Sequence, residues 1–250
     1  MNSVEINKMA ELETDYWWHR GKVFLIQNLI EKYFPQNKDL KILEVGCGTG
    51  GLTKHLTNYG DVTGFDISED AVSYCKSSGL TNIFVQDLNV FDPKPYENTY
   101  DLVLALDVLE HIQDDVGAMK KISVILKKDG LFFINVPAHK FLWSEHDEAL
   151  EHKRRYHSLE LLKKLYDSNY EVLNKSHFVF VVSPIIILYR FWGNLFGKSA
   201  YPKTSYVILP KKINNFMVKI LELETHVMKK ISLPFGVTLN AIARPIKNED

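Results

Sequence analysis

Residues 44–50 join an apolar run to a helical pattern and carry glycine at alternate positions, Gly46, Gly48 and Gly50. Glycine at such a turn allows a positive φ and removes the Cβ that would hold a ligand away from the backbone. The helix that follows offers unpaired N–H groups. The segment therefore predicts a ligand-binding turn between a strand and a helix.

Three further acidic side chains, Asp66, Asp87 and Asp107, each follow an apolar run that is typical of a strand. Ligands of open parallel sheets bind outside the carboxyl ends of the strands, so these acids are expected to share one site with the glycine turn. Together with Glu44 they would repel a pyrophosphate and favour an ammonium group. A cationic ligand that carries a sugar suits this site better than an anionic ligand.

The glycine turn by itself also satisfies a dinucleotide fingerprint. Gly46, Gly48 and Gly51 have the spacing G-x-G-x-x-G, and Asp66 lies twenty residues beyond Gly46. An NAD(P)-dependent oxidoreductase therefore stays open as an alternative. Asp66 also lies just before a predicted helix, so a role as a helix cap is its structural alternative.

Histidines supply candidate general bases, because an imidazole titrates near neutral pH. His146 and His152 lie in residues 138–156, a segment rich in acidic and basic side chains. The four candidates are His111, His139, His146 and His152, with His152 and His146 ranked first. His111 lies four residues beyond Asp107, but no third ligand follows at a telling spacing, so no metal site is predicted.

The same segment ends in two arginines, Arg154 and Arg155, which are candidates to hold a phosphate or carboxylate of an acceptor. Trp143 and Tyr156 flank the segment, which follows the predicted fifth strand over the expected pocket, and they complete the predicted substrate contacts. A solvated, salt-bridged surface loop is the structural alternative for these charged residues.

Length and composition limit the class of protein. The chain has 250 residues, of which 46% are hydrophobic and 24% charged, as is usual for one soluble α/β domain. Thirty basic residues against 31 acidic ones leave a net charge of −1, so no nucleic-acid partner is expected. Cys47 and Cys75 form no C-x-x-C pattern, and no secretion signal is visible, so a cytoplasmic location is expected.

Strand and helix patterns alternate along the chain and would position these side chains. Strands are expected over residues 41–45, 61–67, 82–88, 100–107, 131–136, 170–180 and 236–244. Helices are expected over residues 23–34, 52–59, 70–77, 115–130 and 158–165, with two more in 184–232. This order implies right-handed crossovers and an α/β fold with a doubly wound, mostly parallel seven-stranded sheet.

An aromatic and charged cluster precedes the first helix, over residues 13–20. Trp17 and Trp18 are expected to pack an N-terminal helical cap onto the domain. The other interpretation is functional, with Tyr16, His19 or Arg20 closing over the bound ligand. The residues alone do not decide between the two.

These motifs, taken in order, make the chain resemble the class I S-adenosylmethionine-dependent methyltransferases. The matching residues are the E-x-G-x-G-x-G signature over 44–50, Asp66, the pair 86–87 and the segment 105–111. The resemblance implies a Rossmann-like methyltransferase fold, S-adenosyl-L-methionine as cofactor and S-adenosyl-L-homocysteine as product. It also implies methyl transfer to oxygen or nitrogen of a small-molecule, glycan or lipid-linked acceptor.

The resemblance also assigns roles by position. Residues 46–50 would line the methionine moiety, Asp66 would receive the ribose hydroxyls, and Asp87 would meet the adenine edge. With Tyr16 and Arg20 added, the predicted cofactor site comprises Tyr16, Arg20, Glu44, Gly46, Cys47, Gly48, Gly50, Asp66, Ile67, Asp87, Leu88, Leu106, Asp107, Val108 and His111. Residues 147–156 are similar to a D-x-x-x-x-H-x-R-R-Y pattern of bacterial relatives, formed here by Asp147, His152, Arg154, Arg155 and Tyr156.

One domain is expected over residues 1–250, with a cap (1–38), a core (39–182), a helical insertion or lid (183–233) and a closing strand (234–250). The apolar run 178–197 carries Pro184 and is interrupted by Arg190, so no transmembrane span is expected. The insertion is open to four interpretations: a packing element, a lid, a homodimer face, or a docking surface for lipid or a lipid-linked acceptor. A non-catalytic nucleoside-binding module remains the non-enzymatic alternative.

Overall fold

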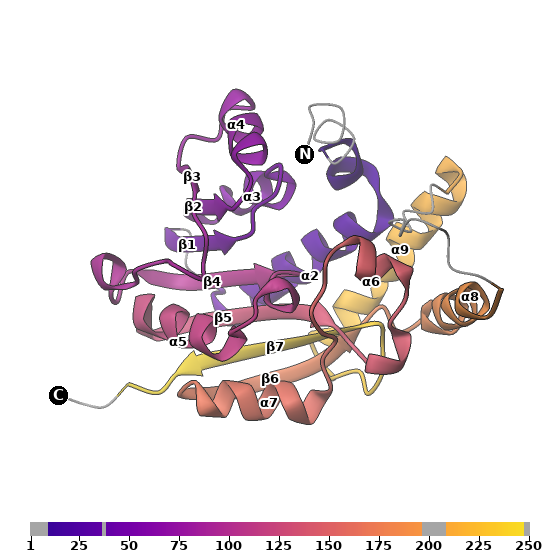
Figure 1. Cartoon of the computed structure of the whole chain (residues 1–250). Coiled ribbons are helices and arrows are strands. Elements are labelled where there is room, and N and C mark those ends of the chain that lie inside the picture. Colours follow the sequence, from indigo (N-terminus) through magenta and orange to yellow (C-terminus); the bar gives the residue numbers. More distant parts are fainter. Residues whose placement is uncertain (1–9, 37–38, 197–208, 248–250) are drawn as a thin grey trace.

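The computed structural model describes residues 10–36, 39–196 and 209–247, and a single sheet runs through it (Figure 1). Its strand order is β3-β2-β1-β4-β5-β7-β6. The strands are β1 (Leu40–Val45), β2 (Gly60–Asp66), β3 (Ile83–Val85), β4 (Tyr100–Leu106), β5 (Leu126–Pro137), β6 (Tyr170–Phe178) and β7 (Thr238–Pro245). Strands β1 to β5 pair in parallel, whereas β7 is antiparallel to both β5 and β6. The predicted mostly parallel, seven-stranded sheet is confirmed.

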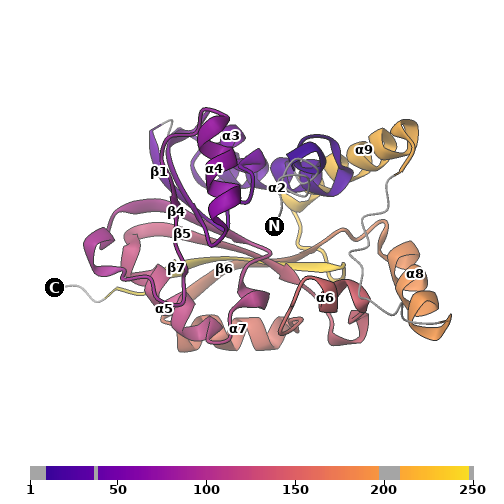
Figure 2. The same cartoon turned by 45° about the horizontal axis from the view of Figure 1, so that its top comes forward.

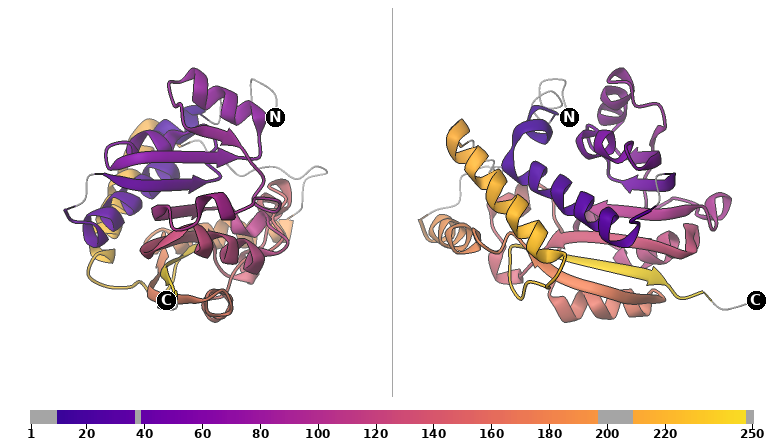
Figure 3. Two further views of the ribbon diagram at one scale, coloured as in Figure 1. Left: turned by 90° about the vertical axis from the view of Figure 1, so that its left-hand side faces the viewer. Right: turned by 180° about the vertical axis from the view of Figure 1, so that it is seen from behind.

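Helices cover both faces of this sheet (Figure 3). Helices α2 (Trp17–Tyr33) and α9 (Lys211–Met228) pack on one face, and α5 (Asp115–Ile125) and α7 (Ser158–Asp167) pack on the other. The remaining helices are α3 (Gly51–Leu56), α4 (Glu69–Ser77), α6 (Glu145–Ala149) and α8 (Ser183–Phe196), with short 3₁₀ turns η1 (Lys94–Tyr96), η2 (Leu109–His111) and η3 (Lys140–Leu142). Figure 2 shows α6 and α8 together at one end of the molecule.

Strand β4 shows why the sheet needs both helical layers. Leu102 and Leu104 join the apolar cluster beneath α2 and α9, and the alternate residues Val103 and Ala105 join the cluster beneath α5 and α7. All four side chains are fully buried, as expected for a strand whose successive side chains point to opposite covered faces.

The helical insertion is tied to the N-terminal helix by polar contacts between residues almost two hundred positions apart. Asn214 Oδ1 of α9 accepts a hydrogen bond from the backbone N–H of Trp17 (3.0 Å). Asn28 Nδ2 of α2 donates to Thr225 Oγ1 of α9 (2.8 Å) in a buried environment. Trp17 is buried in the same apolar cluster, so the expected packing role of the N-terminal aromatic residues is present. Helix α9 is therefore part of the helical layer over the sheet.

Two helices begin at residues whose side chains cap them. The Ser68 hydroxyl accepts a hydrogen bond from the Ala71 N–H at the start of α4, and the Asp114 carboxylate accepts one from the Gly117 N–H at the start of α5. Side-chain capping of this kind depends on neighbours three residues away and is therefore a local property of the sequence.

The predicted helix over residues 115–130 is wrong in its last turn. Helix α5 ends at Ile125, and Leu126 begins β5 as the partner of Tyr100 in β4. Leu126 is fully buried, and Lys127 Nζ pairs with Asp101 Oδ1 (2.8 Å). The cationic residues before Gly130 resemble a helix C-terminus, but their contacts to β4 extend the strand instead. The strand expected over 82–88 is also shorter, because only β3 (Ile83–Val85) pairs with β2.

Candidate active site

A cavity of about 930 Å³ lies at the carboxyl ends of the parallel strands, where open α/β sheets bind ligands. Most of the residues proposed from the sequence line it: Tyr16, His19, Glu44, Gly46, Cys47, Gly48, Asp66, Ile67, Asp87, Leu88, Leu106, Asp107, Val108, His111, His146, His152 and Arg155. The fold thus brings the glycine turn, the acids and three of the four candidate bases to one space. Helices α8 and α9 supply apolar side chains to the opposite part of the wall.

The glycine turn needs glycine for both conformation and space. Gly46, Gly48 and Gly50 all have positive φ, at 72°, 54° and 81°. A Cβ on Gly46 would lie 2.5 Å from Val108 Cγ2, so a side chain there would push into the residue that follows β4. Gly50 does not line the cavity; a Cβ there would meet Leu80 and so disturb packing rather than a ligand.

Asp66 belongs to the glycine turn through its backbone contacts. Its Oδ2 accepts a hydrogen bond from the Gly48 N–H (2.9 Å), and its Oδ1 accepts one from the Ser68 N–H (2.9 Å). Helix α4 is capped by Ser68, so a role for Asp66 as the cap itself is excluded. Each carboxylate oxygen can accept more than one hydrogen bond, which leaves Asp66 able to bind a ligand donor as well.

Glu13 is a residue that the sequence did not single out. From residues 10–15 it reaches the glycine turn, where Oε2 accepts hydrogen bonds from the Gly51 N–H (2.8 Å) and the Thr49 hydroxyl (2.6 Å). Glu13 also lines the cavity. No local pattern could have indicated this contact, because the partners lie 36 and 38 positions away.

Glu44 is buried beside the turn, and burial raises its pKa to about 8 even though the Thr53 hydroxyl donates a hydrogen bond to its Oε2 (2.6 Å). At neutral pH this side chain is mostly protonated. A positive charge in the cavity would favour its ionised form.

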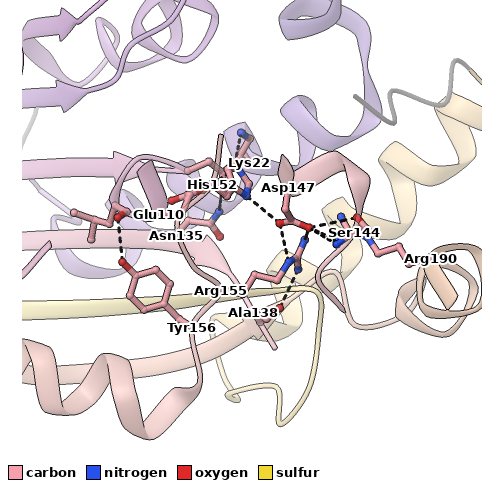
Figure 4. A network of polar contacts seen from close by, with 12 residues as sticks. Lys22, Glu110, Asn135, Ala138, Ser144, Asp147, His152, Arg155, Tyr156 and Arg190 are labelled. Carbon is pink, nitrogen blue, oxygen red and sulfur yellow. Dashed lines mark hydrogen bonds and ion pairs between the residues drawn. The ribbon is translucent and has the colours of Figure 1, made fainter. Parts of the chain in front are cut away.

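Asp107 is held at the end of β4 by a lysine that sequence analysis missed. Its Oδ2 pairs with Lys22 Nζ of α2 (2.9 Å), and its Oδ1 accepts a hydrogen bond from Asn135 Nδ2 of β5 (2.7 Å) (Figure 4). Burial would raise the pKa of Asp107, but the Lys22 charge and these hydrogen bonds outweigh it and lower the pKa. The acidic field expected from the sequence is therefore partly neutralised by α2.

His152 is oriented by the network of Figure 4. Its Nδ1 lies 2.9 Å from Asp147 Oδ1, and its ring packs edge-on against His111 with centroids 4.8 Å apart. Burial would raise the pKa of Asp147, but hydrogen bonds from His152 and Arg155 and the nearby Arg190 charge hold it below its usual range. An ionised Asp147 accepts only, so Nδ1 of His152 carries a proton, and in the neutral ring Nε2 is the atom with the lone pair.

Arg155 lines the cavity, but its donors are engaged by the protein. Its Nε and Nη2 donate to the two oxygens of Asp147 (2.8 and 3.0 Å), and Nη1 donates to the Ala138 carbonyl (3.0 Å). The side chain is only 2% exposed. This geometry does not support the predicted role in binding an acceptor anion and makes Arg155 a support for Asp147.

Four other predicted site residues lie off the cavity wall. Arg154 pairs with Asp115 (2.8 Å), and the Tyr156 hydroxyl donates to Asp115 Oδ2 (2.8 Å) from a fully buried position. The Arg20 guanidinium lies over the Phe24 ring, and Trp143 follows η3 outside the cavity lining. The substrate contacts predicted for Trp143, Arg154 and Tyr156, and the cofactor contact predicted for Arg20, stay predictions that this geometry does not support.

His146 and His111 line the cavity as largely neutral imidazoles. Burial and the Arg190 charge lower the pKa of His146 to about 4, and burial together with His152 lowers the pKa of His111. His139 does not line the cavity and stacks on Phe235, with centroids 4.6 Å apart. Three of the four candidate bases therefore remain beside the cavity.

Glu110 completes a cluster that the sequence spacing did not reveal. Its carboxylate is fully buried and has no hydrogen-bond partner within the described part of the chain, and burial raises its pKa well above the usual value. Glu110, His111 and His152 each offer one ligand atom, and these atoms lie within 4.8 Å of one another. The pair considered from the sequence was Asp107 and His111, whereas the structure groups His111 with Glu110 and with His152 from a distant part of the chain.

Comparisons with known proteins agree with this geometry. A protein-family model described as a methyltransferase domain matches residues 17–175. The ubiquinone biosynthesis O-methyltransferase of Pelagibacter ubique is 26% identical over 154 residues, which cover 54% of this chain and 64% of that protein. The protein of the same name from Coxiella burnetii is 29% identical over 143 residues, 52% of this chain and 60% of that protein. The chain thus spans less than two thirds of the length of these curated relatives.

Solved structures share the fold at low sequence identity. A chain of the complex between the Haloferax volcanii Trm112 methyltransferase activator and a methyltransferase has a TM-score of 0.64 at 15% identity, covering 99% of this chain and 96% of that chain. A TehB-like S-adenosylmethionine-dependent methyltransferase from Corynebacterium glutamicum has a TM-score of 0.58 at 17% identity, covering 98% and 100%.

Proposed function

The chain belongs to the class I S-adenosylmethionine-dependent methyltransferases, and we propose that it transfers the methyl group to an oxygen of a small-molecule acceptor, with His152 as general base. Members of this family use S-adenosylmethionine as their cofactor. Family membership therefore favours methyl transfer over the alternative of an NAD(P)-dependent oxidoreductase. The choice of oxygen is supported by the relatives named ubiquinone biosynthesis O-methyltransferase. The acceptor itself is part of the proposal.

The residues present fit this cofactor. The cavity offers a backbone turn without side chains at Gly46 and Gly48, and carboxyl groups at Glu44, Asp66 and Asp87. A vicinal diol is bound well by a carboxylate acceptor, and hydrogen bonds to charged groups contribute about 1.5–3 kcal/mol. We assign Asp66 to the ribose hydroxyls, Asp87 to the adenine edge, and buried Glu44 to the amino-acid end, where a cation would ionise it.

The observation that carries the proposal is the joint position of two groups on one cavity. The glycine turn with its acids forms one part of the wall, and His152, held by Asp147, forms another. S-adenosylmethionine, when bound, supplies the electrophilic methyl group. The protein aligns the acceptor and, if the acceptor is a hydroxyl, must remove its proton.

His152 suits the second task because its tautomer is determined by its neighbours. The ionised Asp147 carboxylate accepts the Nδ1 hydrogen, so Nε2 is the atom that can take a proton from an acceptor hydroxyl. The same carboxylate would stabilise the imidazolium that results. His146 lacks a comparable role in the proposal because burial and the Arg190 charge disfavour its protonated form.

Binding of S-adenosylhomocysteine tests the cofactor assignment directly. Calorimetry is expected to show binding to the wild type and a loss of at least about tenfold in Asp66→Ala. The matched control is Asp61→Ala, because Asp61 lies on the same strand and accepts a hydrogen bond from exposed Asn82 away from the cavity. Equal affinity in the two variants would contradict the role of Asp66.

Methyl transfer is tested with labelled S-adenosylmethionine and a panel of phenols, alcohols and amines. The proposal expects label in the phenol or alcohol products and none in the amines. Transfer to amines alone would replace oxygen by nitrogen as the acceptor atom. Cofactor binding without turnover on any acceptor class would favour the nucleoside-binding module.

A further inference from the structure

Helix α8 exposes apolar side chains to solvent. Val181, Ile185, Leu188 and Trp192 follow one another at helical spacings of three or four residues and are 55 to 69% exposed, and Phe191 beside them is 66% exposed. In a helix of a water-soluble protein the apolar stripe normally faces the core. This helix and the residue stretch just before it therefore have an apolar surface that the described protein does not cover.

The single charged residue among the described side chains of α8 points the other way. Arg190 Nη1 donates to the Leu142 carbonyl (2.8 Å) and lies 3.5 Å from Asp147 Oδ2, toward the interior (Figure 4). Burial lowers the pKa of Arg190, which agrees with this inward position. The charge therefore anchors α8 to the active-site network, and the apolar side chains remain outside.

The first turns of α9 continue this surface. Ile213 and Phe216 are 49 and 63% exposed. Ile213 also lines the active-site cavity, as do the exposed Ile185 and Tyr189 of α8, so the two helices meet at the rim of that cavity. Figures 1 and 3 place both helices at the same end of the molecule. We call the exposed residues Val181, Ile185, Leu188, Phe191, Trp192, Ile213 and Phe216 the α8–α9 face.

Charge indicates what covers this face. Residues 178–221 contain no Asp or Glu, and besides the inward-pointing Arg190 they contain five lysines, Lys198, Lys203, Lys211, Lys212 and Lys219. The whole chain has a net charge of −1, so this stretch is strongly basic against its background. Lys211, Lys212 and Lys219 of α9 are exposed. A second copy of the chain would place like charges opposite one another, whereas an anionic surface would complement them.

We propose that the α8–α9 face docks on an anionic lipid surface. A helix with apolar and aromatic side chains outward and lysines beside them lies in the boundary between headgroups and acyl chains. Helix α8 has 14 residues, fewer than the roughly 20 that a spanning helix needs, and no described helix is long and apolar enough to cross a bilayer. Contact from one side is the arrangement that remains for this surface.

Docking in this way would place the cavity rim against the lipid. Ile185, Tyr189 and Ile213 would then lie where apolar molecules leave the bilayer. An acceptor with an apolar tail could enter the cavity without crossing water, and this last consequence rests on the proposed function. The docking itself requires neither cofactor nor acceptor.

The experiment is cosedimentation of the full chain with vesicles, without cofactor or acceptor. Phosphatidylcholine vesicles with phosphatidylglycerol are compared with vesicles of phosphatidylcholine alone. The wild type is expected to bind the anionic vesicles about tenfold better, and added salt is expected to weaken that binding. Binding to neither kind of vesicle would overturn the proposal. So would equal binding to both, since the lysines would then have no part.

Substitutions on the α8–α9 face test whether this face is the part of the protein that binds vesicles. Leu188→Ser with Phe191→Ser is expected to reduce binding about tenfold, because both side chains are exposed and neither lines the cavity. The matched control, Val90→Ser with Leu159→Ser, changes side chains that are 76 and 71% exposed elsewhere and should bind as the wild type does. Circular dichroism and S-adenosylhomocysteine affinity check that each variant folds.

Two results would reassign the face. Undiminished vesicle binding by the Leu188 and Phe191 variant, or an equal loss in the control, would place the lipid contact elsewhere. Light scattering that shows a dimer in the wild type, dispersed by the Leu188 and Phe191 changes, together with no vesicle binding, would assign the face to a second copy. All these results are independent of whether the protein transfers a methyl group.

Discussion

Single residues at this site have protonation states that follow from burial and partners rather than from residue type. Glu44 and Glu110 are buried carboxyls whose pKa is raised by burial, whereas Asp147, equally enclosed, has its pKa lowered by His152 and Arg155. The same side chain chemistry thus produces neutral acids and an ionised one within a single network. This difference allows Asp147 to orient an imidazole and Glu44 to respond to a ligand charge.

Replacing His152 by Gln is expected to lower kcat by about 10²- to 10⁴-fold, the usual contribution of a general base, because a Gln amide cannot take the proton that Nε2 of His152 would accept. Cofactor affinity should stay unchanged, since the glycine turn and Asp66 are untouched. The measurement is steady-state turnover together with calorimetry. His146→Gln serves as the control and should lose less than about tenfold.

Dialysis against a chelator separates base catalysis from metal catalysis. The sequence predicts no metal, so dialysis against a chelator is expected to leave wild-type turnover intact. Loss of turnover that magnesium or zinc restores would instead assign Glu110, His111 and His152 to a divalent cation. His152→Gln would then lose metal binding together with activity.

The raised pKa of Glu44 predicts that the free energy of unfolding falls as pH rises. Its folded pKa of about 8 lies above the unfolded value of 4.5, so the folded state holds the proton longer and stability falls as pH rises between them. From pH 6.5 to 8 the loss should be about 1–2 kcal/mol. Denaturant unfolding of wild type and Glu44→Gln measures it as a difference. Parallel pH curves for the two proteins would contradict the assignment.

At the scale of elements, the connections at the strand ends position the side chains of the site. The turn between β1 and α3 must pass beneath Val108, and the segment containing α6 must carry Asp147 to both His152 and Arg155. Each connection thus positions side chains relative to other elements. Changes there should therefore affect binding and stability more than changes of similar size in exposed helices.

Gly46→Ala is expected to destabilise the protein by several kcal/mol and to abolish cofactor binding. It combines a left-handed φ of 72° with a Cβ 2.5 Å from Val108 Cγ2. Gly79→Ala is the control, because its φ of 91° is also positive but nothing lies within 4 Å of the added Cβ. It should cost about 1–2 kcal/mol and leave binding intact. Thermal unfolding and calorimetry compare the two variants, and similar losses in both would remove the steric argument.

Asp147→Asn is expected to cost about 3–5 kcal/mol, because it leaves the buried Arg155 guanidinium without its counter-charge. Asp167→Asn is the control. Its ion pair with Lys163 spans one turn of α7 between exposed side chains, so its loss should cost less than about 0.5 kcal/mol. Chemical denaturation measures both values. A small loss in Asp147→Asn would mean that Arg155 finds another partner.

The whole molecule is one sheet with its ligand site at the strand ends, so cofactor binding should stabilise the fold as a unit. At about 100 times its Kd, S-adenosylhomocysteine is expected to add about 2.7 kcal/mol and to raise Tm by roughly 5–10 °C. Thermal shift measurements test this, with NADH as the control ligand. Protection by NADH instead would favour the dinucleotide alternative.

In the insertion, the packing of the whole molecule determines which apolar residues are buried and which are exposed. Residues 183–233 were open to interpretation as a packing element, a lid, a dimer face or a docking surface. Helix α9 packs on α2 and contributes Val218 and Leu221 to the core, while its first turns and most of the described part of α8 keep apolar side chains outside. One insertion therefore serves both as packing element and as exposed surface, which a hydropathy pattern alone does not distinguish.

Local patterns in the sequence were sufficient for the sheet, most helix starts and the glycine turn, because strand alternation, capping and positive φ depend on residues a few positions apart. They also identified Asp66 and the histidines that line the cavity. The last turn assigned to α5 was wrong because contacts with β4 outweigh a local helix-end pattern.

Only the tertiary structure decided which of these residues act together. Lys22 neutralises Asp107 across 85 positions, Glu13 reaches the glycine turn, and Glu110 meets His152 in space. Two arginines and a tyrosine at positions 154–156 have side chains that could bind a substrate. In the structure Arg154 and Tyr156 contact Asp115 instead, and Arg155 contacts Asp147. Residue type indicates what a side chain can bind, and packing between distant segments determines whether its partner is the protein or a ligand.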